Sequence, residues 1–316
     1  MADGLLGGVL PYIYSRADAL KRTLGDVISN PIASAEQTIN NANDRARVLN
    51  QLQTQVASQG VAGLTSPQGQ ALANIYAQSY NPTGLFIGAK SKVWDSASNE
   101  IAKSLEKQGL TPEQIWLKTG NWKAPDGKWR QEISDQTAEF RADFNASAPS
   151  KANNYVGGLE GQIGGMYRHP DLYQAYPELL AIDRMKLQKL VDWFPESANM
   201  GSYSKTFGGK GTVELRNKTE KGALDSAIHE LQHAIQNLEG WQSGGLESQF
   251  KDMPNLSAFE QYRRLQGEAE ARASAVRRLL TSEERRAIFP EKSYDIPINQ
   301  LTNTDPFGNT IGSSIR

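Results

Sequence analysis

The sequence predicts an α+β fold that is mainly helical and contains a small sheet. In residues 224–240, apolar side chains recur at the spacing of one helix face. A second long segment, which begins at the capping residue Ser257, repeats this pattern. Residues 122–133 instead carry turn residues between two aromatic arms, and residues 212–216 alternate in polarity. Both of these patterns are typical of short strands.

Composition limits the classes of protein to which the chain can belong. It has 316 residues, a net charge of −1 and 38% apolar residues. This allows one or two domains with an ample core and gives no signature of a nucleic-acid binder. Cysteine is absent, which excludes disulfides and thiolate metal sites. We also expect no transmembrane segment and no secretory signal, because no apolar run is long enough and Asp3 replaces a basic start.

The two ends of the chain differ from its middle. Residues 1–65 have long polar helical patterns with a thin apolar line, so we expect an N-terminal helical arm. This arm either extends into solvent or docks on a partner or on the rest of the protein. Residues 66–109 are interpreted as a loop-rich linker, because prolines and glycines interrupt the pattern. Residues 291–316 are rich in Asn, Thr, Gly and Pro and predict an extended tail.

Local signals predict the elements that follow the linker. Thr111, Pro112 and Gln114 have the pattern of a capped helix N-terminus. In the hairpin at residues 122–133, we expect the two tryptophans to pack across the strands. His169 precedes a short helical segment. We interpret it as a cap or a buried side chain, and we keep it as an alternative metal ligand.

The strongest chemical signal is the pentapeptide His229-Glu230-Leu231-Gln232-His233. It has the H-E-x-x-H pattern that zinc-dependent hydrolases use. The chain has three histidines, and two of them lie here, one helical turn apart and nearly opposite the apolar stripe. Their imidazoles can therefore converge on one metal ion, with Glu230 beside it as a catalytic base. The alternative is a pair of histidines that only cap or pack a helix.

A catalytic zinc site needs a third protein ligand, which the pentapeptide does not supply. Residues 267–272 of the second long helix offer two carboxylates, Glu268 and Glu270, next to small alanines that permit close helix approach. Helical phasing places them on either side of the apolar stripe, so periodicity does not choose between them. The alternative is a solvated, ion-paired face, because nearby arginines surround both: Arg263, Arg264, Arg272 and Arg277.

Several segments of the chain together resemble a known family. They are residues 229–236, the Glu-Gly-Trp and Gly-Gly residues that follow, and Tyr262 with the Gly-Glu-Ala-Glu-Ala-Arg run; the approach segments 129–135, 169–177 and 201–203 are also similar. In this combination they resemble the zincin-like domain of large polyvalent proteins, which occur in bacteriophages and conjugative elements. Trp241 stands where the family has phenylalanine.

The resemblance implies a zincin-like metallopeptidase core at residues 110–290. It further implies a Zn²⁺ ion held by His229, His233 and Glu268. Glu268 is favoured because related zinc peptidases have a small residue three positions after the ligand, and Glu270 is the alternative third ligand.

We therefore expect a zinc-dependent metallopeptidase-like protein of phage origin that hydrolyses an amide bond, with Glu230 as general base. The strand around Val213 is expected to align an extended peptide by edge pairing. Tyr203, Tyr262 and Arg272 are candidates for stabilising the oxyanion, and the sequence does not rank them.

Two other functions remain open at this point. One is a virion structural or ejected protein whose zinc site is mainly structural, and the other is a peptidoglycan endopeptidase. The expected partners are a peptide or protein substrate, or other virion proteins. The expected location is the phage virion, or the host cytoplasm after delivery.

Overall fold

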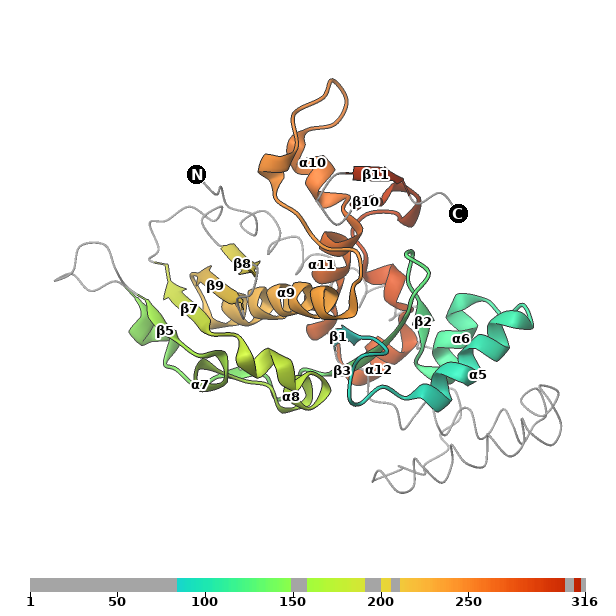
Figure 1. Cartoon of the computed structure of the whole chain (residues 1–316), viewed down its shortest axis with the longest axis horizontal. Coiled ribbons are helices and arrows are strands. Elements are labelled where there is room, and N and C mark those ends of the chain that lie inside the picture. The colour runs from blue at the N-terminus through green and yellow to red at the C-terminus, as the bar shows by residue number, and fades with distance from the viewer. Residues whose placement is uncertain (1–83, 149–157, 191–199, 206–210, 305–309, 314–316) are drawn as a thin grey trace.

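The computed structural model describes residues 84–148, 158–190, 200–205, 211–304 and 310–313, which combine helices with small sheets (Figure 1). The expected arm at residues 1–65 lies outside these ranges and stays a prediction. A long helix, α9 (Glu220–Glu239), runs through the middle of the molecule. It packs on a second helix, α11 (Gln266–Arg278), and on the strands of the largest sheet.

Helix α9 has well-defined ends and a buried apolar stripe. The Thr219 side chain accepts the Gly222 N–H at its start, and Gly240 ends it in the left-handed conformation at φ 67°. Along the predicted stripe, Leu224 and Leu238 are partly buried and Ile228, Leu231 and Ile235 are fully buried. Burial of each of the last three stabilises the fold by about 1.5–3 kcal/mol. This stripe fixes which side of α9 faces the core.

The largest sheet has four strands in the order β5-β7-β9-β8. They are β5 (Leu159–Gly161), β7 (Arg184–Lys189), β9 (Thr212–Asn217) and β8 (Met200–Ser204). Strand β9 pairs in parallel with β7 and antiparallel with β8, so both of its edges are occupied. The expectation that the strand around Val213 offers a free edge is therefore wrong. Within the described part of the chain, the edge strand on this side is β8.

A second sheet contains the predicted hairpin. Strands β2 (Trp122–Lys123) and β3 (Trp129–Ser134) pair antiparallel, which confirms the hairpin. Trp122 lies opposite Arg130, while Trp129 lies opposite Lys123. Adjacent positions of a strand point to opposite faces, so the two tryptophans do not pack against each other as expected. Trp122 instead contacts Phe86, Phe289 and Tyr294 edge to face.

The segment that was expected to be a linker contributes to the core from residue 84 onward. Strand β1 (Gly84–Ile87) pairs with β3, and its four residues are buried. Helices α5 (Ser96–Lys107) and α6 (Pro112–Thr119) follow. The capping box between Thr111 and Gln114 is present, as predicted. The loop-rich pattern thus concealed a short, wholly apolar strand.

The single long helix expected after Ser257 is broken into α10 (Ala258–Arg263) and α11. Leu265 between them is extended, with φ −59° and ψ 128°. The Arg264 carbonyl, which would continue the helix, instead accepts the Thr302 N–H at 2.8 Å. A distant strand therefore interrupts the helix, which periodicity alone does not reveal.

Shorter elements complete the described fold. They are β4 (Glu139–Phe140), β6 (Tyr167–Arg168), α7 (Ile163–Met166), α8 (Pro170–Ala175), α12 (Ser282–Ala287), β10 (Thr302–Thr304) and β11 (Thr310–Ser313). The expected extended tail differs from the structure in its first part, because Tyr294 and Leu301 are buried in the core. No helix in the described ranges has the length and apolar character needed to cross a membrane.

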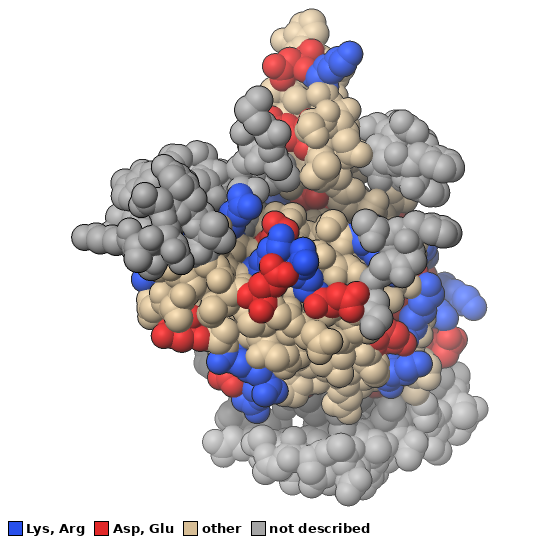
Figure 2. Space-filling model, turned by 60° about the vertical axis from the view of Figure 1, so that its left-hand side comes forward, with Lys and Arg blue, Asp and Glu red and all other residues tan. Residues whose placement is uncertain are grey.

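Charged side chains of both signs are interspersed on one face of the molecule. On the face shown in Figure 2, Lys and Arg lie among Asp and Glu, with large areas of other residues between them. Exposed ion pairs such as Arg168–Glu139 and Arg184–Glu160 join opposite charges. Exposed pairs of this kind contribute little to stability, about 0–1 kcal/mol each.

Candidate metal centre

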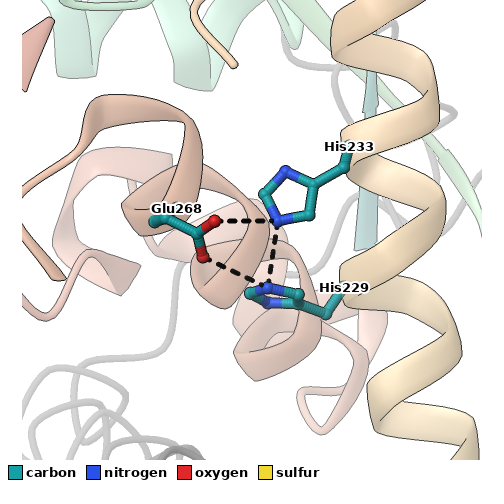
Figure 3. Close-up of side chains that lie close together, drawn as sticks. All are labelled: His229, His233 and Glu268. Atoms are coloured by element: carbon teal, nitrogen blue, oxygen red, sulfur yellow. Dashed lines mark hydrogen bonds and ion pairs between the residues drawn. The ribbon is translucent and has the colours of Figure 1, made fainter. Parts of the chain in front are cut away.

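Three side chains from two helices converge beside a pocket (Figure 3). His229 and His233 lie one turn apart on α9, and Glu268 lies in the first turn of α11. The two Nε2 atoms are 3.1 Å apart. Each is 3.4 Å from one oxygen of Glu268: His229 from Oε2 and His233 from Oε1.

These distances fit a shared zinc ion. Ligand atoms at about 2.0–2.1 Å from a tetrahedral zinc ion lie about 3.3–3.4 Å from one another. The two Nε2 atoms are 3.1 Å apart, and each is 3.4 Å from a different Glu268 oxygen. One ligand atom from each side chain lies within 4.8 Å of the others, so the three side chains can reach a common ion. Two imidazoles and a carboxylate are also the donor set that zinc accepts without cysteine. The residues present therefore suit the ion that the pentapeptide implies.

The alternatives for the third ligand lie elsewhere. The Glu270 carboxylate binds Arg130, with Oε2 at 3.1 Å from Nη2, and its Oε1 faces Gln232 and Gln236 of α9 rather than the histidines. His169 is buried and caps α8, where its Nδ1 accepts the Leu172 N–H at 3.2 Å. Among the described residues, the structure groups only Glu268 with the two histidines as a possible metal-binding set.

Glu268 is held by neighbours that the sequence did not reveal. The Tyr262 hydroxyl donates to its Oε2 at 2.6 Å, and the Gly245 N–H donates to its Oε1 at 3.1 Å. Gly244 lies so close that a Cβ there would collide with the Glu268 carboxylate and the His233 ring. Burial raises the pKa of Glu268, but the two imidazoles hold it well below its usual value. The carboxylate is thus ionised and fixed in place.

The two histidines differ in their protonation. Burial lowers the pKa of His229 to about 4, so its imidazole is neutral. Burial also lowers the pKa of His233, but Glu268 outweighs this effect and raises the value to about 9. A divalent ion would compete with the proton on His233, because metal binding requires the neutral imidazole.

Glu230 lies next to this cluster and lines the same pocket. Burial raises its pKa to about 8, a shift that His233 and a backbone hydrogen bond from Tyr203 oppose and Glu268 reinforces. Its carboxyl therefore changes protonation near neutral pH. This property is the one expected of a group that accepts and then returns a proton.

The pocket has a volume of about 390 Å³. It is lined by residues 201–205, most of which belong to the edge strand β8, and by residues 243–246, which follow α9. Tyr203 and Tyr262 line it, whereas Arg272 lies outside and binds Asp295 at 2.8 Å. Arg272 is thereby engaged with the segment that follows α12, which leaves the two tyrosines as candidates for contacting a substrate.

A family comparison adds independent information about part of the chain. The family described as Large polyvalent protein associated domain 23 matches residues 84–141. Through this segment, the chain is similar to large polyvalent proteins. This confirms the polyvalent-protein part of the resemblance and agrees with a phage-associated protein. The match ends before α9 and leaves the candidate ligands outside it. Comparisons with curated proteins and with solved structures gave no match.

The polyvalent-associated segment 84–141 nevertheless contacts α9 and α11, the helices that carry the candidate ligands. Its β1 offers the Phe86 N–H and carbonyl to the Gln232 side chain on α9, at 2.9 and 3.2 Å. Its β3 offers Arg130 to Glu270 on α11. The matched segment therefore packs against both helices that carry the candidate ligands.

Proposed function

We propose that this protein is a zinc-dependent hydrolase of amide bonds, with a zincin-like core and a phage origin. The observation that carries the proposal is the convergence of two imidazole nitrogens and a carboxylate, with ligand atoms within 4.8 Å of one another, beside the buried Glu230. A zinc ion held by His229, His233 and Glu268 would supply a Lewis acid that activates water and polarises a carbonyl.

Glu230 acts as the general base and then as the general acid. Its carboxylate takes the proton that water loses when it attacks the amide carbon, and it returns this proton to the leaving nitrogen. Burial raises the pKa of this carboxyl above its usual value, which makes it a stronger base for the proton of water. Since Glu230 follows His229 directly on α9, the helix holds the base beside the ligands.

The edge strand β8 is the surface that aligns the substrate. Residues 201–204 of this strand line the pocket, and an extended peptide can add to a free strand edge through backbone hydrogen bonds. Tyr262 already donates its hydroxyl proton to Glu268. Tyr203, which is partly buried on β8, is thus the better placed of the two tyrosines to contact a carbonyl oxygen.

Metal content and hydrolysis together test this function. Zinc measured by mass spectrometry after gel filtration is expected at one ion per chain in the wild type, and lost in His233→Ala and Glu268→Ala. Glu214→Ala is the control, because it removes a carboxylate that pairs with Lys186 on the sheet, away from the three ligands, and leaves zinc bound. Hydrolysis of a mixed peptide library is expected for the wild type and absent for zinc-loaded Glu230→Gln. A wild-type chain without zinc would refute the proposal.

A second candidate function has one observation in its favour. The polyvalent-associated segment 84–141 lies in the same core as the ligands, which suits a phage protein whose zinc joins two helices mainly for stability. In that case zinc-loaded wild type and Glu230→Gln behave alike toward every peptide. The two functions therefore separate on the hydrolysis assay, with zinc content unchanged.

A further inference from the structure

The outer nitrogen of His233 faces a side chain that the proposed reaction does not use. His233 Nδ1 lies 2.8 Å from Gln236 Oε1, one turn further along α9. Gln236 is fully buried, so this contact is shielded from water. The corresponding nitrogen of His229 has no hydrogen-bond partner among the described residues. His233 is therefore the histidine whose ring a neighbouring side chain can orient.

The surroundings of Gln236 determine which end of its amide meets His233. The Gly267 carbonyl lies 2.8 Å from Nε2, and a carbonyl can only accept a hydrogen bond. The nitrogen of the amide must therefore face Gly267, and its oxygen must face His233. Because that oxygen can only accept, His233 Nδ1 carries a proton. The lone pair of a neutral His233 is then on Nε2, which faces Glu268 and His229.

The amide nitrogen of Gln236 also contacts a buried ion pair, Glu270 and Arg130. Glu270 Oε1 lies 3.5 Å from Gln236 Nε2, and Glu270 Oε2 accepts two hydrogen bonds from Arg130 at 3.1 and 3.3 Å. Arg130 is stacked on Trp241, with its guanidinium carbon 3.3 Å from the ring centroid. Arg130 belongs to β3 and thus to the polyvalent-associated segment 84–141. The support of His233 therefore extends into that segment.

We propose that Gln236, held by Gly267 and by the Glu270–Arg130 pair, is a positioning residue that fixes His233 as the Nδ1–H tautomer for metal binding. This inference rests on the proposed zinc site. Partners of this kind orient a histidine ligand, and their loss typically lowers metal affinity by about 10–100-fold. Glu270, the alternative third ligand, then supports Gln236 instead of binding the metal.

Zinc affinity of three variants tests the proposal. Gln236→Met removes the acceptor and is expected to weaken zinc binding about 10–100-fold in a competition titration. Gln236→Glu keeps an acceptor for Nδ1–H but sets a carboxylate oxygen against the Gly267 carbonyl and Glu270, so it is expected to lose stability and still to bind zinc more tightly than Gln236→Met. Gln232→Met is the matched control: it removes an equally buried glutamine of α9 that bonds Phe86 rather than a histidine. It is expected to destabilise the chain and leave zinc affinity unchanged.

The tautomer can also be observed directly. The chain has three histidines, so the ring nitrogens of zinc-loaded wild type can be assigned by nitrogen-15 NMR. We expect a His233 Nδ1 proton that exchanges slowly with water, and loss of this protection in Gln236→Met. Zinc on Nδ1, or Gln236→Met with the affinity of Gln232→Met, would overturn the inference while the zinc site stands. A wild type that binds no zinc would instead refute the proposed function, and the inference with it.

Discussion

Glu268 and Glu270 are two residues apart on α11, yet their carboxylates have different partners. Two residues turn a helix by about 200°, so the side chains leave on opposite sides. Glu268 meets two imidazoles, a tyrosine hydroxyl and a backbone N–H. Glu270 meets Arg130 and the amide of Gln232. Which glutamate faces the histidines is thus set by the rotation of α11 about its axis.

At the same scale, only glycine fits at position 244, because a side chain there would collide with Glu268 and His233. Gly244→Ala places a methyl group against Glu268 and His233, so zinc affinity is expected to fall by at least tenfold. Gly165→Ala is the control, since a Cβ there meets no atom within 4 Å. Both affinities are measured by competition with a chromophoric chelator. Equal affinities for the two variants would show that the residues after α9 do not press on the site.

The buried His169 is expected to make the stability of the fold depend on pH. Burial lowers its folded pKa from 6.5 to about 4, so between these values the unfolded chain binds a proton that the folded chain does not. Its contribution to stability is therefore complete above about pH 6.5 and falls as the pH drops toward 4. From pH 7.5 to pH 5, wild type is expected to lose about 2 kcal/mol more than His169→Asn, which keeps a capping oxygen. Urea unfolding of both at the two pH values measures this, and parallel losses would contradict it.

At the scale of elements, local signals predicted much of the fold. The caps at Thr111 and Ser257, the hairpin at residues 122–133 and the stripe of α9 depend on neighbours in sequence, and the structure contains each of them. Contacts between distant residues were not predictable. One example is the strand order of the four-stranded sheet, in which β8 rather than β9 is the edge strand. Another is the hydrogen bond from the Thr302 N–H to the Arg264 carbonyl, at the point where the long helix is broken. That interruption brings Tyr262 within hydrogen-bonding distance of Glu268.

Strand β3 and helix α11 are joined by the buried Arg130–Glu270 pair, and this link is testable. Arg130 also pairs with the buried Asp126 at 3.0 Å, so Arg130→Met leaves two buried carboxylates without a cation and is expected to cost about 3–5 kcal/mol. Glu270→Met leaves Arg130 paired with Asp126 and is expected to cost less. The double variant removes both charges and is expected to cost less than the sum of the single variants. Urea unfolding of all four proteins gives the coupling free energy. Additive costs would mean that the two elements are not coupled through this pair.

At the scale of the whole molecule, the polyvalent-associated segment and the candidate metal centre share one core. Buried residues of β1, α9 and α11 belong to the same apolar cluster. Sequence alone placed the boundary of the domain at residue 110, inside the matched range 84–141, because β1 resembles part of a loop-rich stretch. The pentapeptide and the family resemblance were sufficient to select the three residues that converge. They gave no indication of Gln236, Gly245 or the support from Arg130.

This shared core predicts how zinc affects the chain. Zinc at about 100 times its dissociation constant should stabilise the folded state by about 2.7 kcal/mol, and chelation should remove this gain. Because Gln232 joins α9 to Phe86, hydrogen exchange is expected to slow in β1 as well as in α9 and α11. Mass spectrometry of exchange with zinc and with chelator provides the comparison. Slowing confined to α9 and α11 would indicate that the matched segment opens independently of these two helices.

We propose that one zinc ion is bound between α9 and α11. Anomalous diffraction at the zinc edge from crystals of the zinc-loaded protein tests it most directly. The expected result is one peak at about 2.0–2.2 Å from His229 Nε2, His233 Nε2 and a Glu268 oxygen, with Glu230 outside this distance. A peak on other residues, or no peak at a saturating zinc concentration, would contradict the account.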